Sequence, residues 1–510
     1  MKKTQAIFSL ITILVVMEFS NSFTQTILSY PIVDTDQDVF YDTINEISEP
    51  LPGENFYGQD AHYNGFQSSY EDNGDGTITD LVTGLMWQKS PDMDNDGDID
   101  YQDKMSYGEA VAGAASFNLA GYTDWRLPSI KEMYSLIVFS GKDPSGYEGT
   151  STEDLIPFIN TDYFDFAYGD LSANERIIDA QMASSNIYVG TTMMGDETMF
   201  GVNFADGRIK GYGTGPMPGQ FEDKQFYVMY VRGNEYGINE FVDNEDGTIT
   251  DNSTGLMWTK NDDGEGMNWQ AALNYAESST FADHSDWRLP NAKELQSILD
   301  YTRAPSVSNS AAIDPVFNCS EITDEGGNTN YPFYWTGTTH ASWQENAPGG
   351  FGAYVCFGEA LGWMEQMPPG SGNYTLMDVH GAGSQRSDPK SGNPANWPYG
   401  HGPQGDVIRI FNYVRLVRDA DTSMGFDDNK LNDLNYEIYP NPSDEIIKIK
   451  LENNLSGTIE VYNFNGCMVL MQELAHQKIQ EINISTIPSG LYLISINSIN
   501  GIFTSRFVKR

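Results

Sequence analysis

The chain is poor in the residues that most often provide covalent cross-links, cationic binding surfaces and membrane spans. Only 3 cysteines occur in 510 residues, so a framework of disulfides does not hold the fold together. Lysine and arginine total 28 against 72 aspartates and glutamates, and the net charge of −44 argues against nucleic acid as a partner. Beyond residue 22, no stretch reaches the roughly 18 apolar residues that a transmembrane helix needs.

Recognisable catalytic motifs are also absent from the sequence. There is no GxSxG nucleophile elbow, HExxH zinc motif, phosphate-binding P-loop or paired Cys/His arrangement. A carbohydrate hydrolase would need two cooperating carboxylates, and no such pair stands out in this acidic chain. Cys319 and Cys356 could form one disulfide in an oxidising compartment or remain buried thiols, which leaves Cys467 single. The sequence therefore predicts no catalytic residues.

The sequence does contain one long string twice. Residues 72–87 read DNGDGTITDLVTGLMW, and residues 243–258 read DNEDGTITDNSTGLMW. The string DWRLP then occurs at 124–128 and again at 286–290. A shared string of this length predicts two copies of one domain.

Each copy is expected to open with a hairpin. Asp75-Gly76 and Asp246-Gly247 favour a two-residue turn, because glycine accepts positive φ without steric cost. The Thr-Ile-Thr that follows alternates as a half-buried strand does. Asp72 and Asp80 could be argued into a metal site with Asp75, but an Asp-Gly turn needs no metal, and we favour the hairpin.

A short helix is expected after each DWRLP. Ser129–Glu132 and Asn291–Glu294 each place an N-cap residue three positions before a glutamate, as in a capping box. Arg126 and Arg288 lie between Trp and Leu, where we expect structural guanidinium groups that bind loop carbonyls or a carboxylate. Further strands are expected at 188–192, 227–232, 334–339 and 413–418.

The order of these motifs resembles the Lcl C-terminal domain family, and is more distantly similar to the formylglycine-generating-enzyme and C-type-lectin-like fold. The resemblance covers residues 66–233 and 240–418. It implies a compact α+β domain with long irregular loops, and a tendency toward surface adhesion or glycan binding.

An acidic stretch in the first copy resembles the calcium loop of EF-hand proteins. Residues 92–103 read DMDNDGDIDYQD, with Gly97 at loop position 6, where the sharp turn is made. Aspartate at position 12 resembles dockerin-type loops and predicts weaker binding than glutamate there. The two tryptophans of the repeated strings are 38 residues apart in copy one (125 − 87) and 29 in copy two (287 − 258), so this loop is an insertion. The alternative is a solvated acidic loop; the predicted calcium ligands are Asp92, Asp94, Asp96, Asp98, Asp100 and Asp103.

Copy two differs from copy one by a long stretch between Thr339 and Val407 that is rich in glycine, proline and aromatic residues. Loops of this length inside a compact domain are usually functional or disordered, and aromatic residues argue against disorder. Exposed indole faces could stack on sugar C–H groups or on protein side chains, although the rings could equally pack the loop onto its own domain. The candidate ligand-binding residues are Trp343, Trp363, Trp397 and Tyr399.

The two ends of the chain predict export. Lys2-Lys3 followed by the apolar run 7–16 is typical of a signal peptide. YPNP at 439–442, INISTIPSGLYLISI at 482–496 and a basic RFVKR end resemble the type A C-terminal sorting domain of the type IX secretion system. Strands of an all-β sandwich are expected there at 446–451, 459–464, 482–484, 491–496 and 503–508.

The predicted organisation is a signal peptide (1–22), an N-terminal extension (23–65), two repeats (66–233 and 240–418), a linker (419–436) and the sorting domain (437–510). The fold class is α+β, with two tandem C-type-lectin-like repeats and a C-terminal β-sandwich. The expected function is a secreted or surface-attached, adhesin-like protein that binds a glycan or protein ligand. The alternatives are a structural matrix protein and, less favoured, a carbohydrate-active enzyme. Expected partners are calcium, the type IX machinery and that ligand, without nucleic acid or a transmembrane segment in the mature protein.

Overall fold

The computed structural model describes residues 28–216, 221–366 and 370–420, together with 436–439, 443, 446–451, 457–462, 468–474, 477–488, 490–498 and 501–510. The chain divides into two compact units, residues 1–420 and 421–510, which are described separately. The predicted signal peptide, most of the linker and Cys467 lie outside the described residues. No helix in the described part of the chain is long and apolar enough to cross a membrane.

The repeated strings form the same four-stranded sheet twice. Both sheets are antiparallel, and in both the final strand of the repeat pairs with the TGLMW strand. The shared hydrophobic residues are buried: Trp87 and Trp258 are fully enclosed. The first sheet contains β3 (Tyr70–Asp72), β4 (Thr77–Asp80), β5 (Met86–Gln88) and β11 (Val231–Arg232), and the second contains β12 (Phe241–Asp243), β13 (Thr248–Asp251), β14 (Leu256–Thr259) and β22 (Val417–Asp419).

The hairpin turns are longer than expected. Four residues, 73–76, separate β3 from β4, so the prediction of a two-residue turn is wrong. Asp75 Oδ1 accepts hydrogen bonds from the backbone N–H and hydroxyl of Thr77, at 3.2 and 2.6 Å, and Asp246 does the same in the second repeat. Gly76 has φ +87°, a conformation that favours glycine. The aspartate therefore stabilises the turn through these hydrogen bonds.

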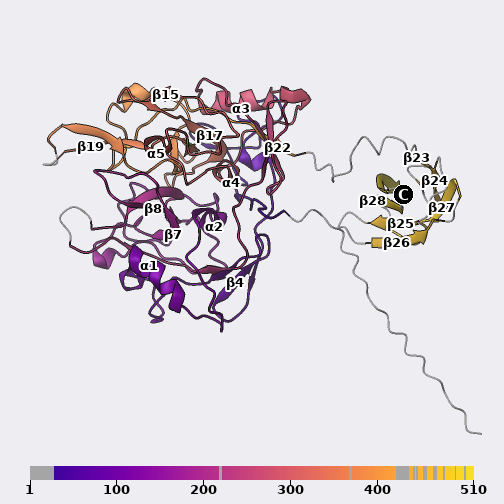
Figure 1. Ribbon diagram of the computed structural model, residues 1–510, viewed down its shortest axis with the longest axis horizontal. Coiled ribbons are helices and arrows are strands. Elements are labelled where there is room, and N and C mark those ends of the chain that lie inside the picture. Colours follow the sequence, from indigo (N-terminus) through magenta and orange to yellow (C-terminus); the bar gives the residue numbers. More distant parts are fainter. Residues whose placement is uncertain are drawn as a thin grey trace, which may run out of the picture. The chain divides into compact units, whose positions relative to one another are not determined.

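A six-stranded antiparallel sheet joins the two repeats. Figure 1 labels its two outermost strands, β7 (Gln181–Ile187) and β17 (Phe333–Thr339). Ile209 of β9 pairs with Gln385 of β21 at its centre, so the sheet runs symmetrically from one repeat into the other. The strand expected at 188–192 is wrong, because the strand in that region ends at Ile187. In spatial order the strands are β7 (Gln181–Ile187), β8 (Thr198–Asn203), β9 (Arg208–Gly213), β21 (Gln385–Pro389), β18 (Phe351–Cys356) and β17 (Phe333–Thr339).

Two short helices lie against this sheet, and α2 contacts α4 near the middle of the unit (Figure 1). Both begin with the predicted capping boxes: α2 (Ile130–Ser135) is capped by Ser129 and α4 (Ala292–Ser297) by Asn291. Arg126 makes a bidentate ion pair with Glu132 at 2.6 and 2.5 Å, and Arg288 makes the same pair with Glu294 at 2.6 and 2.8 Å. The structural role expected for both arginines is confirmed. The other helices are α1 (Tyr107–Gly113), α3 (Trp269–Glu277) and α5 (Pro305–Ser308).

The long stretch of repeat 2 is not irregular, contrary to expectation. It contributes β18 and β21 to the central sheet, and between them an antiparallel hairpin of β19 (Leu361–Glu365) and β20 (Tyr374–Asp378), seen at the edge of Figure 1. Cys319 and Cys356 are free thiols, and Cys319 Sγ lies 3.1 Å from Tyr334 Oη. The remaining short strands are β1 (Phe40–Tyr41), β2 (Glu46–Ile47), β6 (Met105–Ser106), β10 (Gln225–Phe226), β15 (Ile322–Thr323) and β16 (Thr329–Asn330).

The N-terminal extension binds both repeats. The amide of Gln37 donates to the carbonyl oxygens of Phe139 in repeat 1 and Thr339 in repeat 2, at 3.2 and 2.7 Å. Asp60 is buried and accepts hydrogen bonds from the hydroxyls of Thr35 and Thr338, at 2.8 and 2.6 Å. The extension therefore belongs to the core of this unit.

The C-terminal unit is a β-sandwich, as predicted. Residues of both of its sheets, such as Ile449 and Ile494, share one hydrophobic core. The order of strands is β23-β24-β27 in one sheet and β26-β25-β28-β29 in the other. Their bounds are β23 (Tyr436–Tyr439), β24 (Ile446–Leu451), β25 (Gly457–Tyr462), β26 (Met468–Glu473), β27 (Ile479–Asn483), β28 (Gly490–Ser498) and β29 (Gly501–Lys509).

Candidate binding pocket between the repeats

A cavity of about 770 Å³ lies where the central strands of the two repeats meet, and both repeats line it. Its size is within the range of pockets that bind small molecules. Arg208 and Lys210 of β9 line it, while Ile209 between them is buried in the hydrophobic core. Successive residues of a strand point to opposite faces of the sheet. The pocket is therefore on the face opposite to the core and its helices.

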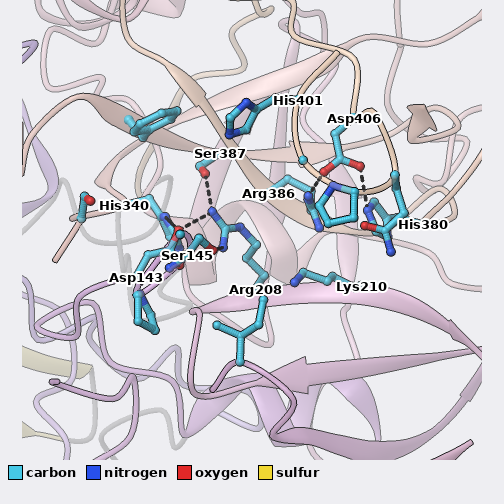
Figure 2. Close-up of a pocket in the computed structure, with 18 of the residues that line it drawn as sticks. Asp143, Ser145, Arg208, Lys210, His340, His380, Arg386, Ser387, His401 and Asp406 are labelled. Carbon is cyan, nitrogen blue, oxygen red and sulfur yellow. Dashed lines mark hydrogen bonds and ion pairs between the residues drawn. The ribbon is translucent and has the colours of Figure 1, made fainter. Parts of the chain in front are cut away.

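The pocket walls are rich in cations, unlike the chain as a whole. Because Ile209 is paired with Gln385 in antiparallel register, Arg208 and Arg386 lie at opposite positions of the two central strands. Figure 2 shows Arg208, Lys210 and Arg386 along the pocket, with a histidine beside each end of the row. Five cationic residues line the cavity: Arg176, Arg208, Lys210, Lys224 and Arg386.

Two ion pairs hold the arginines of the central strands in place. Arg208 binds the carboxylate of Asp143 at 2.6 Å and also donates to the hydroxyl of Ser387 in repeat 2, at 3.1 Å. Arg386 binds Asp406 on the other side of the pocket. Burial would raise the pKa of both aspartates, but the adjacent arginine charges hold each pKa well below its usual range. Both carboxylates are therefore ionised and neither is suited to donate a proton.

Two neutral histidines complete the inner wall. His340 Nε2 lies 2.8 Å from the carbonyl oxygen of Asp206, and His380 Nε2 lies 2.9 Å from Asp406 Oδ1. Burial lowers the pKa of each histidine to about 4, so both rings are uncharged near neutral pH. His380 is 2% exposed, and its Nδ1 has no hydrogen-bond partner in the described part of the chain. The Nε N–H of Arg208 is likewise buried and unpartnered there.

The predicted calcium loop forms elsewhere, as an insertion between β5 and α1. Carboxylate oxygens of Asp92, Asp94 and Asp96 come within 4.8 Å of one another, as ligands of one cation would. Asp103 instead accepts from the backbone N–H groups of Met93 and Asp94 at 2.7 and 3.3 Å, and of Asp100 at 2.9 Å. The structure thus brings three of the six predicted ligands together and uses the carboxylate of Asp103 to close the loop. Asp98 is exposed, and Asp100 is half-buried and caps the 3-10 turn Tyr101–Asp103.

The four candidate aromatic residues are half-buried or exposed, and none of them lines the cavity. Trp343 lies at its margin, where its ring meets the pocket residue Tyr147 edge-on at 5.0 Å. Tyr399 stacks on Tyr374 at 4.1 Å beside the β19–β20 hairpin, and Trp363 meets Tyr399 edge-on at 6.2 Å. Trp397 directly follows the 3-10 turn Pro394–Asn396.

The pocket residues were not predicted from the sequence. Arg208 and Arg386 are far apart along the chain, and no short motif surrounds either of them. Cationic residues are scarce in this chain, and this scarcity is the signal that could have been used. Five of the 28 lysines and arginines line the pocket. The three histidines of the pocket, His340, His380 and His401, are half of the six in the chain.

Comparison with known proteins agrees with the repeats and the tail. The Lcl C-terminal domain family matches residues 76–232 and 247–376, and the secretion system C-terminal sorting domain matches residues 437–510. No curated protein matches the chain. A solved structure, "Biofilm associated protein - BSP domain", shares 11% identity over 65% of this chain and 51% of its own, with a TM-score of 0.14, so the chain spans about half the length of that protein.

The sorting domain is of the type IX class, which indicates export and a secreted or cell-surface protein that is handled by the type IX machinery. The two matched segments of the other family cover more than half of the chain. The first contains β4, β5 and β11 of the first four-stranded sheet, and the second contains β13 and β14 of the second. The protein belongs to the Lcl C-terminal domain family, in a tandem form followed by a type IX sorting domain.

Proposed function

We propose that this exported protein binds a hydroxyl-rich ligand, a saccharide, in the pocket between its repeats, and that this binding gives it an adhesin-like role. The observation that carries the proposal is the pair of buried, unpartnered groups on the pocket wall. His380 Nδ1 is free to accept a hydrogen bond when Nε2 donates to Asp406, and Arg208 Nε is free to donate one. A hydroxyl group can satisfy either, since it both donates and accepts.

The shape of the pocket supports a small ligand or the end of a chain. The strands that form its floor are tied into one sheet across both repeats, so the site is rigid and ready-formed. Tyr147, which is half-buried, also lines the cavity and offers an aromatic ring to the C–H face of a sugar. The same proposal includes a C-type-lectin-like fold for each repeat.

Binding is favoured over hydrolysis by the state of the pocket carboxylates. A glycosidase needs a general acid whose pKa is raised, beside a second carboxylate. Asp143 and Asp406 have the opposite property, because arginine charges keep the pKa of each below its usual range. Both are also fixed in ion pairs and cannot turn toward a substrate without breaking them.

A glycan array probed with the mature chain tests this function. We expect selective binding that Tyr147→Ala weakens, because this half-buried ring belongs to the pocket. Tyr399→Ala is the matched control, since this ring is 49% exposed and lies in the aromatic cluster outside the cavity. Loss of binding in the Tyr399 variant alone would move the site to the β19–β20 hairpin. Silence across the whole array would favour a structural matrix protein.

A further inference from the structure

A lysine, a carboxamide and a carboxylate form a connected row where α2 meets the segment between the repeats. Lys131 Nζ donates to Asn239 Oδ1 at 2.8 Å, and Asn239 Nδ2 donates to Asp251 Oδ2 at 2.8 Å. The side chain of Asp251 is fully buried, and it also accepts from the hydroxyl of Thr254 at 2.9 Å. The carbonyl carbon of Asn239 therefore lies beside the lysine nitrogen, and a carboxylate contacts its amide nitrogen.

The surroundings of Lys131 favour an uncharged amine. Its three hydrogen-bond acceptors in the described part of the chain are the oxygens of Gly237, Asn239 and Ser297, and none of them is ionised. The nitrogen also lies 5.5 Å from the centroid of the Tyr30 ring. Burial lowers the pKa of Lys131 to about 8, so about a tenth of the amine is uncharged at pH 7. An uncharged lysine amine is a nucleophile.

We infer that Lys131 and Asn239 join in an intramolecular isopeptide bond, and that Asp251 carries the proton in this reaction. The lone pair of Nζ forms a bond to Cγ of Asn239, and the bond between Cγ and Nδ2 breaks. The proton that Nζ gives up passes through the carboxylate of Asp251 to Nδ2, which leaves as ammonia. No oxidant, reductant or other co-reactant is needed. Because the fold holds both groups in contact, they react without the entropy cost of an encounter.

The second repeat supplies an internal comparison. Lys293 occupies the place of Lys131, but it donates to the backbone carbonyl oxygens of Asp34 and Ser135, at 2.8 and 2.9 Å. Its hydrogen bonds in the described residues include no carboxamide, and a backbone amide at this place could not be attacked without cutting the chain. The lysine of the first repeat thus has an electrophile within reach that its counterpart lacks.

The bond would give an exported chain a covalent link that reducing agents do not break. Cys319 and Cys356 are free thiols, so the described cysteines supply no such link. The isopeptide bond would close a loop that contains β7, β8 and β9, and would tie α2 to the segment between the repeats. One hydrogen remains on Nζ, and it can still donate to the carbonyl of Ser297. The inference does not depend on the proposed ligand.

Peptide mapping of the full chain by mass spectrometry, after reduction and complete denaturation, tests this bond. Trypsin does not cut after a lysine whose amine is acylated, so peptides 127–131 and 132–142 should appear as one peptide, 127–142. We expect this peptide to be joined to peptide 233–260, which contains Asn239. The mass of the joined pair should fall short of the sum of the two peptides by one ammonia molecule.

Three variants assign the roles, and a fourth is the matched control. Lys131→Arg keeps a cation at this place without a nucleophilic amine, and Asn239→Ala removes the carbon that is attacked. We expect neither to contain the joined peptides. Asp251→Asn removes the proton carrier and should leave the two peptides separate in most of the protein. Lys293→Arg changes the counterpart lysine and should retain the full cross-link.

Each alternative result contradicts a definite part of the inference. Separate, unmodified peptides from the folded wild type would overturn it, and Lys131 and Asn239 would then be joined by a hydrogen bond only. Loss of ammonia from peptide 233–260 alone, with normal cleavage after Lys131, would indicate a succinimide at an asparagine and would overturn it as well. A complete cross-link in Asp251→Asn would show that this carboxylate does not carry the proton.

Discussion

Lys131 of α2 donates to the carbonyl oxygen of Ser297 at the end of α4, at 2.7 Å, and Lys293 of α4 donates to that of Ser135 at the end of α2, at 2.9 Å. The two lysines occupy the same place in the two repeats. The carbonyls at a helix C-terminus lack partners within the helix and carry partial negative charge. Each repeat therefore caps the helix of the other, and duplication has produced an internal interface with reciprocal contacts.

These crossed contacts predict that both lysines stabilise the fold. Lys131 also donates to the carbonyl of Gly237 and to the side chain of Asn239, at 3.2 and 2.8 Å, so its loss leaves several buried acceptors unpaired. We expect Lys131→Met and Lys293→Met each to lower the free energy of unfolding by about 1–3 kcal/mol in denaturant titrations. Lys89→Met is the control, because it breaks a partly exposed ion pair and should cost less than about 1 kcal/mol. Equal effects of all three would contradict a capping role.

Asp60 predicts a pH dependence of stability with a defined sign. Burial raises the pKa of Asp60 to about 7, from a usual value of 3.8. Between these values the folded chain keeps a proton that the unfolded chain has lost, so this contribution to stability is full below about pH 4 and is lost as the pH rises through 7.

Asp60→Asn should remove this dependence while its amide oxygen still accepts from Thr35 and Thr338. We therefore expect the stability of the wild type, relative to the variant, to fall between pH 4 and pH 7 in denaturant titrations. Asp72→Asn should show the opposite pH dependence, because the hydrogen bond from Lys89 lowers the pKa of Asp72. The stability that ionised Asp72 contributes is therefore lost only as the solution becomes more acidic. A flat difference for Asp60 would show that the carboxyl is ionised throughout.

The features that the sequence predicted correctly depend on short stretches of chain. The capping boxes at Ser129 and Asn291 rest on residues three positions apart, and the sandwich strand Ile446–Leu451 rests on local alternation. Local patterns of this kind determine local structure directly. They also identified the nine-residue insertion, since α1 begins 19 residues after β5 (107 − 88) and α3 begins 10 after β14 (269 − 259).

The features that the sequence did not predict depend on contacts between residues that are far apart along the chain. Nothing near Ile209 or Gln385 indicates that they face each other, yet this pairing creates the central sheet and the pocket. Lys131 and Lys293 read as ordinary polar positions of amphipathic helices, and their role becomes visible only where α2 contacts α4. The aromatic residues of the stretch after Thr339 are conspicuous in the sequence, whereas Arg386 of the same stretch joins the cationic residues of repeat 1 only in the folded chain.

The acidic loop predicts calcium binding. Asp92, Asp94 and Asp96 bring three carboxylates together at the surface, where their repulsion destabilises the free loop and a divalent cation would relieve it. Calcium should therefore raise the melting temperature of the wild type and leave Asp92→Asn/Asp96→Asn unshifted. Magnesium at the same concentration is the control, because it demands a tighter octahedral site. If calcium does not raise the melting temperature of the wild type, the stretch is a solvated acidic loop and the calcium prediction is wrong.

Asp103 should behave differently from the other aspartates of that loop. Its buried carboxylate accepts three backbone N–H groups across the loop, so Asp103→Ala should lower the melting temperature in calcium-free buffer as well. Asp92→Asn should lower it less, because the half-buried carboxylate of Asp92 accepts only two backbone N–H groups, those of Asn95 and Gly97, and its loss also reduces repulsion. If both variants are equally stable without calcium, the structural role of Asp103 is wrong.

The sorting domain predicts where a truncated chain accumulates. A chain that ends at residue 436 keeps the predicted signal peptide and lacks the type IX domain, so in a bacterium with this secretion system it should cross the inner membrane and remain in the periplasm. Cell fractionation and immunoblotting check this against the full-length chain, which should appear at the surface or in the medium. Fusing residues 437–510 to a periplasmic reporter is the matched control, because the β-sandwich is a compact unit by itself and should direct the reporter outside. Release of the truncated chain would show that the signal for export across the outer membrane lies in the repeats.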